Sequence, residues 1–170
     1  MSAPVSQNEF REAMSRLGAA VNIVTSAGPA GRIGLTVSAV CSVTDAPPSL
    51  LVCIRRASVL HDAFLRNGTL CVNVLSAGQG DLSPLFAGQG ALTMDERFAH
   101  ADWTEITTGA PALTGAAVAV DTRIAQAIEV GTHSVLVCHI HGLRLHDRVS
   151  GLMYFGRGYH RLTPQDAGCA

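Results

Sequence analysis

Two adjacent arginines and a serine stand where a β-branched run gives way to a helical pattern. Arg55 and Arg56 follow the run Ser49–Ile54, and Ser58 begins the segment SVLHDAFLR. Guanidinium groups pair well with phosphate oxygens, and a helix N-terminus attracts anions through its free N–H groups. The pattern therefore indicates a phosphate-binding turn with Ser58 as the helix N-cap. A solvated arginine pair beside an ordinary N-cap is the plainer alternative, and these residues alone leave both interpretations open.

Hydroxyl and imidazole side chains also gather on two predicted strand faces. Thr36 and Ser38 alternate along one run, so they point the same way and either line a pocket or face solvent. Without further context, solvent is the simpler interpretation. His139 and His141 share a face of a later run, but no spacing supplies the remaining ligands of a closed metal site. We therefore expect no metal.

The charged residues exclude several classes of function. Among 170 residues, 12 are basic and 13 are acidic, which gives a net charge of −1, and every basic residue is an arginine. A chain without lysine cannot be a P-loop ATPase, a pyridoxal Schiff-base enzyme or an S-x-x-K acyl enzyme. Since no basic block is present, we expect no binding to nucleic acid or to an anionic membrane surface.

Hydropathy and cysteine usage indicate where the protein works. The chain is 48% hydrophobic and 15% charged, against a charged fraction of about 25% in typical soluble domains. Such a low-charge surface favours a homodimer or larger assembly. No apolar stretch approaches the ~18 residues of a membrane span, and the first residues lack a secretory signal, so we expect a cytoplasmic protein. The cysteines form no C-x-x-C pair and are expected to be structural thiols: Cys41, Cys53, Cys71, Cys138 and Cys169.

The local patterns predict mostly short strands. A capping-box signature, Ser6-x-x-Glu9, opens an amphipathic helix that ends near Gly18. Further helices are predicted over Ser58–Arg66, Asp81–Ala87 and Met94–His100. Strands are predicted over Val21–Thr25, Ile33–Val40, Ser49–Ile54, Thr69–Leu75, Ala116–Val130, Ser134–His146 and Leu152–Phe155. These elements indicate one mainly β domain over residues 1–170, an antiparallel barrel or sandwich with a few short helices at its ends.

Together the motifs resemble the flavin reductase-like family, whose fold is the FMN-binding split barrel. That fold is an antiparallel Greek-key β-barrel with short flanking helices. The resemblance covers about residues 8–162. The matching stretches, in chain order, are FREAMSRLGAAVNIVT, GLTVSAVCSVTDAPPSLLVCI, RRAS, CVNVL, LFAG, ERF, GTH and YFGRGYHRL.

This resemblance implies an NAD(P)H-dependent flavin oxidoreductase that transfers a hydride from NADH or NADPH to FMN or FAD. Such enzymes are mostly homodimers that supply reduced flavin to a separate monooxygenase, for example one acting on hydroxyphenylacetate, another aromatic compound or a pyrimidine. Because the cofactors supply the chemistry, no strong general acid or base is required. Three alternatives stay open: a corrinoid reductase of cobalamin synthesis, a split barrel that binds flavin or heme without turnover, and a domain that only dimerises.

The resemblance also implies roles for individual residues. The expected cofactor-binding residues are Thr36, Val37, Ser38, Ala39, Cys53, Ile54, Arg55, Arg56, Ser58, Asn73, Phe155 and Arg157. Residues 36–39 match the segment along the flavin ring, and the two arginines with Ser58 match the phosphate anchors. His133 matches a histidine near which nicotinamide meets the flavin, and it is the expected catalytic residue. Thr132 departs from the family pattern, in which Asp is common, and Arg55 with Ala57 replaces an Asn and a Ser.

Overall fold

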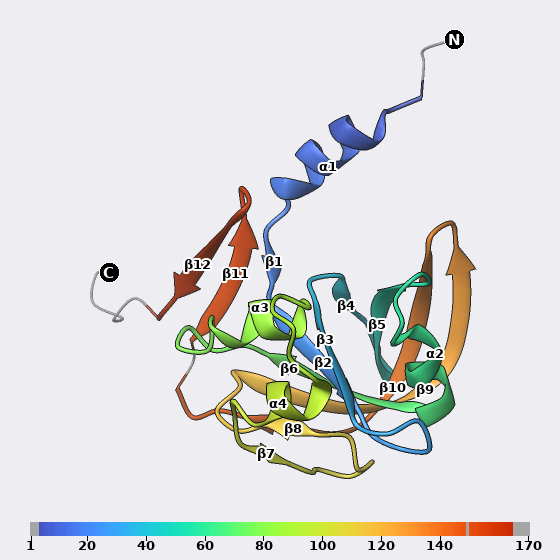
Figure 1. The fold of residues 1–170 in the computed structure, drawn as a ribbon, viewed down its shortest axis with the longest axis vertical. Coiled ribbons are helices and arrows are strands. Elements are labelled where there is room, and N and C mark those ends of the chain that lie inside the picture. Colours follow the sequence, from blue (N-terminus) through green and yellow to red (C-terminus); the bar gives the residue numbers. More distant parts are fainter. Residues whose placement is uncertain (1–3, 149, 165–170) are drawn as a thin grey trace.

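A seven-stranded antiparallel sheet forms the body of the protein (Figure 1). The computed structural model describes residues 4–148 and 150–164. From one edge to the other, the sheet contains β3 (Ile33–Val37), β2 (Asn22–Ser26), β6 (Thr69–Val74), β9 (Val118–Val130), β10 (His133–Leu145), β5 (Pro48–Arg55) and β4 (Val40–Asp45). Every pairing in it is antiparallel. The expected mainly β split barrel is thereby confirmed.

The two edges of this sheet are joined by two residues. β3 and β4 lie at opposite edges, yet Ser38 and Ala39 alone separate them along the chain. The Cys53 N–H donates to the Ala39 carbonyl at 3.0 Å, which holds this crossing against β5. The prediction of one strand over Ile33–Val40 was therefore wrong at its end, because the chain leaves β3 after Val37 and pairs with β5 instead.

Smaller elements surround the barrel. A three-stranded sheet contains β1 (Ala19–Ala20), β11 (Gly151–Phe155) and β12 (Gly158–Leu162), and a two-stranded sheet contains β7 (Trp103–Thr104) and β8 (Ala112–Leu113). The helices are α1 (Gln7–Ser15), α2 (His61–Asn67), α3 (Leu82–Phe86) and α4 (Met94–Phe98). Each predicted helix is present, whereas β4, β12 and the two-residue strands were not predicted. Among the described residues, no helix is both long and apolar enough to cross a membrane.

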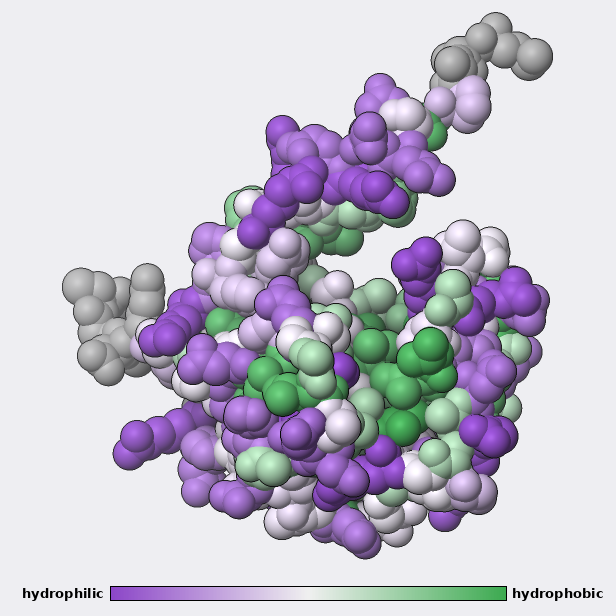
Figure 2. Space-filling model, viewed as in Figure 1, coloured by the Kyte–Doolittle hydropathy of each residue, from purple (hydrophilic) through white to green (hydrophobic). Residues whose placement is uncertain are grey.

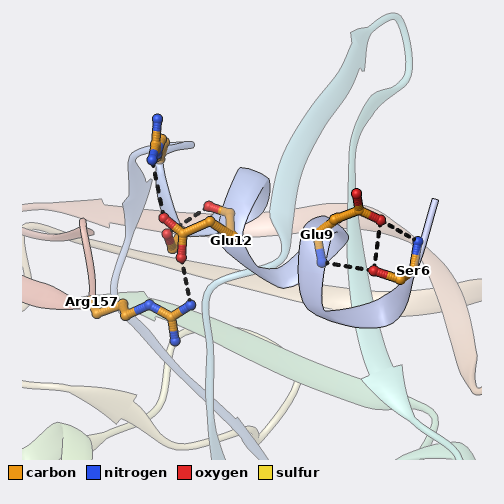
Figure 3. Close-up of polar contacts among 6 residues, drawn as sticks. Ser6, Glu9, Glu12 and Arg157 are labelled. Carbon is orange, nitrogen blue, oxygen red and sulfur yellow. Dashed lines mark hydrogen bonds and ion pairs between the residues drawn. The ribbon is translucent and has the colours of Figure 1, made fainter.

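The first helix begins as its sequence predicts but does not pack on the barrel. The Glu9 N–H donates to Ser6 Oγ at 3.3 Å, and the Ser6 N–H donates to the Glu9 carboxylate at 2.9 Å (Figure 3). The Ser6 hydroxyl also donates to the Glu9 carboxylate at 2.7 Å, and this bond together with the one from the Ser6 N–H lowers the pKa of Glu9. Beyond this capping box the helix projects from the body of the protein (Figure 1), and none of its residues is buried.

Two large groups of buried side chains and a smaller third one hold the strands together. The barrel interior is filled by Val24, Leu50, Val52, Ile54, Phe64, Leu70, Val72 and Leu136, among others. Under α3 and α4, the rings of Phe86, Phe98 and Trp103 meet edge to face with centroids 4.8 to 5.7 Å apart. Gly34 of β3 allows this contact, since a Cβ there would lie 2.6 Å from the Phe86 ring. The ring cluster thus fixes β3 against α3.

Asn73 is a polar member of the core. It is fully buried on β6, and its amide Nδ2 donates to the Ile23 carbonyl and to Thr25 Oγ1, each at 3.0 Å. Its Oδ1 accepts from the Leu113 N–H at 2.7 Å. The structure therefore places Asn73 where it joins three segments inside the protein, and it does not line the cavities described below.

We predict that Asn73→Ala lowers the free energy of unfolding by roughly 2–4 kcal/mol, because it leaves buried backbone groups without partners. Urea denaturation would measure this loss. The exposed Asn8 of α1 is the matched control, and Asn8→Ala should cost less than about 0.5 kcal/mol. Equal stabilities of the two variants would contradict the structural role of Asn73.

Candidate functional site

The crossing between β3 and β4 forms one wall of a cavity of about 490 Å³. The end of β5 and the turn that follows it form the facing wall, and the first residue of β10 closes one side. The lining residues are Leu35, Thr36, Val37, Ser38, Ala39, Cys53, Ile54, Arg55, Ala57, Ser58, Ala87 and His133. Nine of the residues expected from the sequence therefore meet here: Thr36, Val37, Ser38, Ala39, Cys53, Ile54, Arg55, Ser58 and His133.

Two backbone N–H groups without a partner among the described residues lie at the crossing, in residues that line this cavity. Ser38 and Ala39 lie outside both neighbouring strands, and neither N–H has an acceptor within the described part of the chain. Thr36, by contrast, uses its hydroxyl to donate to the Ser83 carbonyl at 2.6 Å. The crossing therefore offers hydrogen-bond donors of fixed direction, which suit a ligand that carries or develops negative charge.

The two adjacent arginines have different surroundings. Arg55, the last residue of β5, lines the cavity, and no hydrogen bond or ion pair engages its guanidinium among the described residues. Arg56 points to the β9–β10 turn, where its Nη2 lies 3.0 Å from a carboxylate oxygen of Glu129. The Arg56 N–H donates to the Thr132 carbonyl at 3.0 Å. Of the two arginines expected to anchor the phosphate, the structure thus brings Arg55 into the cavity and leaves Arg56 beside it.

Ser58 lies in the turn between β5 and α2 rather than at the helix cap. The N-cap of α2 is Leu60, which makes no side-chain capping bond, so the prediction that Ser58 caps this helix was wrong. The reason is that the chain forms a separate tight turn first, in which the Ser58 N–H donates to the Arg55 carbonyl at 3.0 Å. Ser58 Oγ accepts from the Leu60 N–H at 3.3 Å, and its hydroxyl proton stays available to the cavity.

His133 stands between this cavity and a second one. The second cavity has a volume of about 620 Å³ and is lined by Val5, Ser6, Gln7, Phe10, Arg11, Arg55, Thr132 and His133. Figure 2 shows it as the hollow beneath α1, whose apolar side faces the body of the protein. His133 Nδ1 lies 2.9 Å from the Thr132 hydroxyl, so its Nε2 is the nitrogen left for a ligand. Arg55 and His133 are shared by both cavities.

The C-terminal hairpin contributes to neither cavity in this structure. Arg157 Nη2 donates to the Glu12 carboxylate at 2.8 Å (Figure 3). The Gly156 N–H donates to the Ser15 carbonyl at 2.7 Å, so the hairpin is tied to α1. The bond from Arg157 holds the pKa of Glu12 below its usual value. Phe155 is exposed on β11. Phe155 and Arg157 were expected to bind the cofactor, and the structure does not bring them to the cavity walls.

The cavity wall contains one thiol, Cys53. Burial raises the pKa of Cys53, which disfavours the reactive thiolate form. Burial also raises the pKa of Cys138, to about 12. No group of three His, Cys, Asp or Glu side chains within residues 4–148 and 150–164 could hold a metal ion. Cys169 lies outside the described residues.

Sequence reasoning missed the part of the site that α1 supplies. Phe10 and Arg11 line the second cavity, and neither residue stood out among the expected ones. A signal was present in the apolar face of the first helix, which includes Phe10 and Met14 and has no partner within the described chain. Such a face has to meet either a ligand or another protein surface.

Known proteins resemble this chain in sequence and in fold. The profile of the flavin reductase like domain matches residues 14–163. The FMN reductase (NADH) RutF of Klebsiella pneumoniae (strain 342) is 56% identical over 153 residues, which are 90% of this chain and 92% of that protein.

Solved structures agree with the sequence matches. BorF, the flavin reductase component of a bacterial two-component tryptophan halogenase, superposes with a TM-score of 0.86 at 27% identity, over 94% of this chain and 100% of that one. The NADH:FAD oxidoreductase SgcE6 of Streptomyces globisporus C-1027, solved with NAD and FAD fragments, gives a TM-score of 0.86 at 26% identity and covers 98% of both chains. By its sequence and its fold, this chain belongs to the flavin reductase-like family.

Proposed function

We propose that this flavin reductase transfers a hydride from NADH to FMN. The observation that carries the proposal is the pair of neighbouring cavities that share Arg55 and His133, since hydride transfer needs two flat rings in contact across a common boundary. The flavin belongs in the cavity at the crossing and the nicotinamide in the one beneath α1. The name of the Klebsiella relative, FMN reductase (NADH), supports this choice of the two reactants over FAD and NADPH.

The residues of the first cavity fit a flavin mononucleotide. Val37 and Ile54 supply apolar surface for a ring, and the free N–H groups of Ser38 and Ala39 supply donors for its polar edge. When bound, the flavin accepts the hydride that NADH gives up. Donors fixed in advance by the crossing then stabilise the negative charge that accompanies this transfer, without any reorganisation of the protein.

The phosphate of FMN belongs at the turn after β5. Arg55 brings a guanidinium that no carboxylate among the described residues neutralises, and Ser58 brings a hydroxyl proton. Arg56 already pairs with Glu129, so its contribution to the phosphate is indirect, through the placement of the β9–β10 turn. α2 has seven residues and starts at His61, so the anchor rests on these side chains and not on a helix dipole.

His133 positions the nicotinamide. Its Nδ1 is engaged by Thr132, and its ring stands at the shared boundary of the two cavities. A hydrogen bond from the remaining nitrogen to the nicotinamide amide would hold that ring against the flavin. The hydride moves directly between the two reactants, so His133 needs neither to donate nor to accept a proton.

The protein is proposed to act in the cytoplasm as a homodimer that supplies a separate flavin-dependent monooxygenase. Phe10 and Met14 of α1, together with Ile128 and Val130 near the β9–β10 turn, are exposed apolar side chains that a second copy would cover. The cysteines of the described chain are free thiols, which suits a reducing compartment. The description of BorF as a component of a two-component system supports the separate acceptor enzyme.

The direct test is NADH oxidation by the purified protein under anaerobic conditions, with FMN, FAD, riboflavin or no flavin added. We expect oxidation that depends on flavin and is most efficient with FMN, and slower oxidation when NADPH replaces NADH. Flavin that binds but is not bleached by either nucleotide would contradict a reductase and favour a binding module.

The two arginines give a matched pair of variants. Arg55→Ala should weaken FMN binding roughly tenfold to a hundredfold, because it removes a charged partner of the phosphate. Riboflavin, which has no phosphate, should lose less than about threefold in affinity. Arg56→Ala is the control and should change the ratio of the two affinities far less. Flavin fluorescence titration measures both ligands, and an equal loss for FMN and riboflavin in Arg55→Ala would rule out the anchor.

The nicotinamide role of His133 is tested by separating binding from turnover. His133→Ala should lower kcat with NADH roughly tenfold, since the two rings lose their alignment, and should change the FMN dissociation constant by less than about threefold. The exposed His141 on the same strand is the control, and His141→Ala should leave both quantities unchanged. Unaltered kcat in His133→Ala would remove this residue from the site.

A further inference from the structure

A buried histidine behind the cavity wall joins the two halves of the site. His61, the first residue of α2, is 8% exposed. Its Nδ1 lies 2.8 Å from Asp62 Oδ1, and its Nε2 lies 2.9 Å from Ser134 Oγ. An ionised carboxylate only accepts hydrogen bonds, so Nδ1 donates to Asp62, and the Ser134 hydroxyl is the partner of Nε2.

The order Asp62, His61, Ser134 has the connectivity of a hydrolytic triad, but the serine cannot act as a nucleophile. Ser134 is 2% exposed and lies inside the sheet, opposite Ile54 of β5. It lines neither of the two cavities. A substrate carbonyl has no path to its hydroxyl, so this contact is a link between elements and not a reaction centre.

The link spans the two functional parts of the site. On one side, the His61 N–H donates to the Ser58 carbonyl at 3.0 Å, so His61 closes the turn that holds the proposed phosphate anchors. On the other side, Ser134 directly follows His133 on β10. No further partner for the Ser134 hydroxyl exists among the described residues. Loss of the imidazole therefore leaves a buried hydroxyl unpaired next to His133.

The remaining contacts of α2 do not replace this link. At the C-terminal end of the helix, the Asn67 amide donates to Ser26 Oγ at 3.1 Å and accepts from the Ala30 N–H at 2.8 Å, both on the β2–β3 hairpin. Phe64 is buried in the barrel core. His61 is thus the side chain of α2 whose hydrogen bond fixes the helix to β10, and it stands nearest the phosphate turn.

We propose that His61 is a positioning residue that, through Ser134, holds the phosphate turn and His133 in a fixed relation. The inference rests on the proposed function, since it assumes that FMN phosphate lies at that turn. Arg55 stays paired with His133 across β5 and β10, but without the bond Ser58 and the start of α2 lose their side-chain link to β10. The Ser58 end of the turn is then held less firmly relative to His133, and the phosphate of FMN loses part of its anchor.

The test compares four proteins by their affinities for FMN and riboflavin, well below their melting temperatures. His61→Leu, Ser134→Ala and the double variant should each lower the preference for FMN over riboflavin roughly fivefold. The double variant should lose no more than either single one, because both changes remove the same bond. His61→Gln, whose amide can still reach Ser134, should keep most of the preference, and it serves as the measurement if His61→Leu does not fold.

The chain offers a matched control on the same two strands. His139 Nδ1 lies 3.0 Å from Ser49 Oγ, at a cross-strand pair of β10 and β5 away from both cavities. His139→Leu and Ser49→Ala should leave the preference for FMN unchanged whatever they do to stability. A merely structural role of His61 would lower the melting temperature without changing that preference, and this result would overturn the proposal, as would additive losses in the double variant.

The flavin titrations do not depend on NADH oxidation, so the reductase function and the positioning role of His61 are tested independently. A wild-type protein that prefers FMN but does not oxidise NADH would overturn the reductase function, and the link would still be tested by the variants. An active reductase whose preference for FMN survives both His61→Leu and Ser134→Ala would overturn only the positioning role.

Discussion

The site depends on the closure of the barrel by two residues. An edge strand leaves half of its backbone groups without a partner in the sheet, and here the chain passes from one edge directly to the other. Ser38 and Ala39 are too short a segment to form a ladder with both β2 and β5. One carbonyl is used to hold the crossing against β5, and the two N–H groups remain free at the cavity. The geometry that completes the fold thus also supplies hydrogen-bond donors for the proposed flavin site.

Arg55 and Arg56 are neighbours in the chain but have different contacts, because successive side chains at a strand end point in opposite directions. Arg55 points into the cavity, whereas Arg56 reaches the β9–β10 turn and pairs with Glu129. That exposed ion pair contributes little to stability by itself. The same turn carries Thr132 and His133. In the proposed function, Arg55 therefore contacts the ligand, and Arg56 places the start of the strand that carries His133.

Local sequence patterns predicted the elements that depend on capping residues and on the spacing of apolar residues. The capping box of Ser6 and Glu9, the helices and the apolar strands β5 and β6 are all present. β4 was missed because most of its residues are exposed and show no apolar alternation, so only its pairing with β5 makes it a strand. The family resemblance identified most of the cavity residues. It also assigned Asn73 to the cofactor, whereas Asn73 is a core residue whose amide oxygen accepts from the Leu113 N–H of β8. The sequence does not show that β8 lies beside Asn73.

The apolar side chains of the first helix stay exposed in the single chain. With nine residues this helix is shorter than the ~12–15 that an isolated helix needs for stability in water. It is held by its capping box and by the contacts of Glu12 and Ser15 with the C-terminal hairpin, while its apolar residues stay exposed. Phe10 and Arg11 nevertheless form a wall of the proposed nicotinamide cavity. In the proposed dimer, a second copy that covers this helix would also fix that wall, so assembly and the binding of the hydride donor would depend on the same surface.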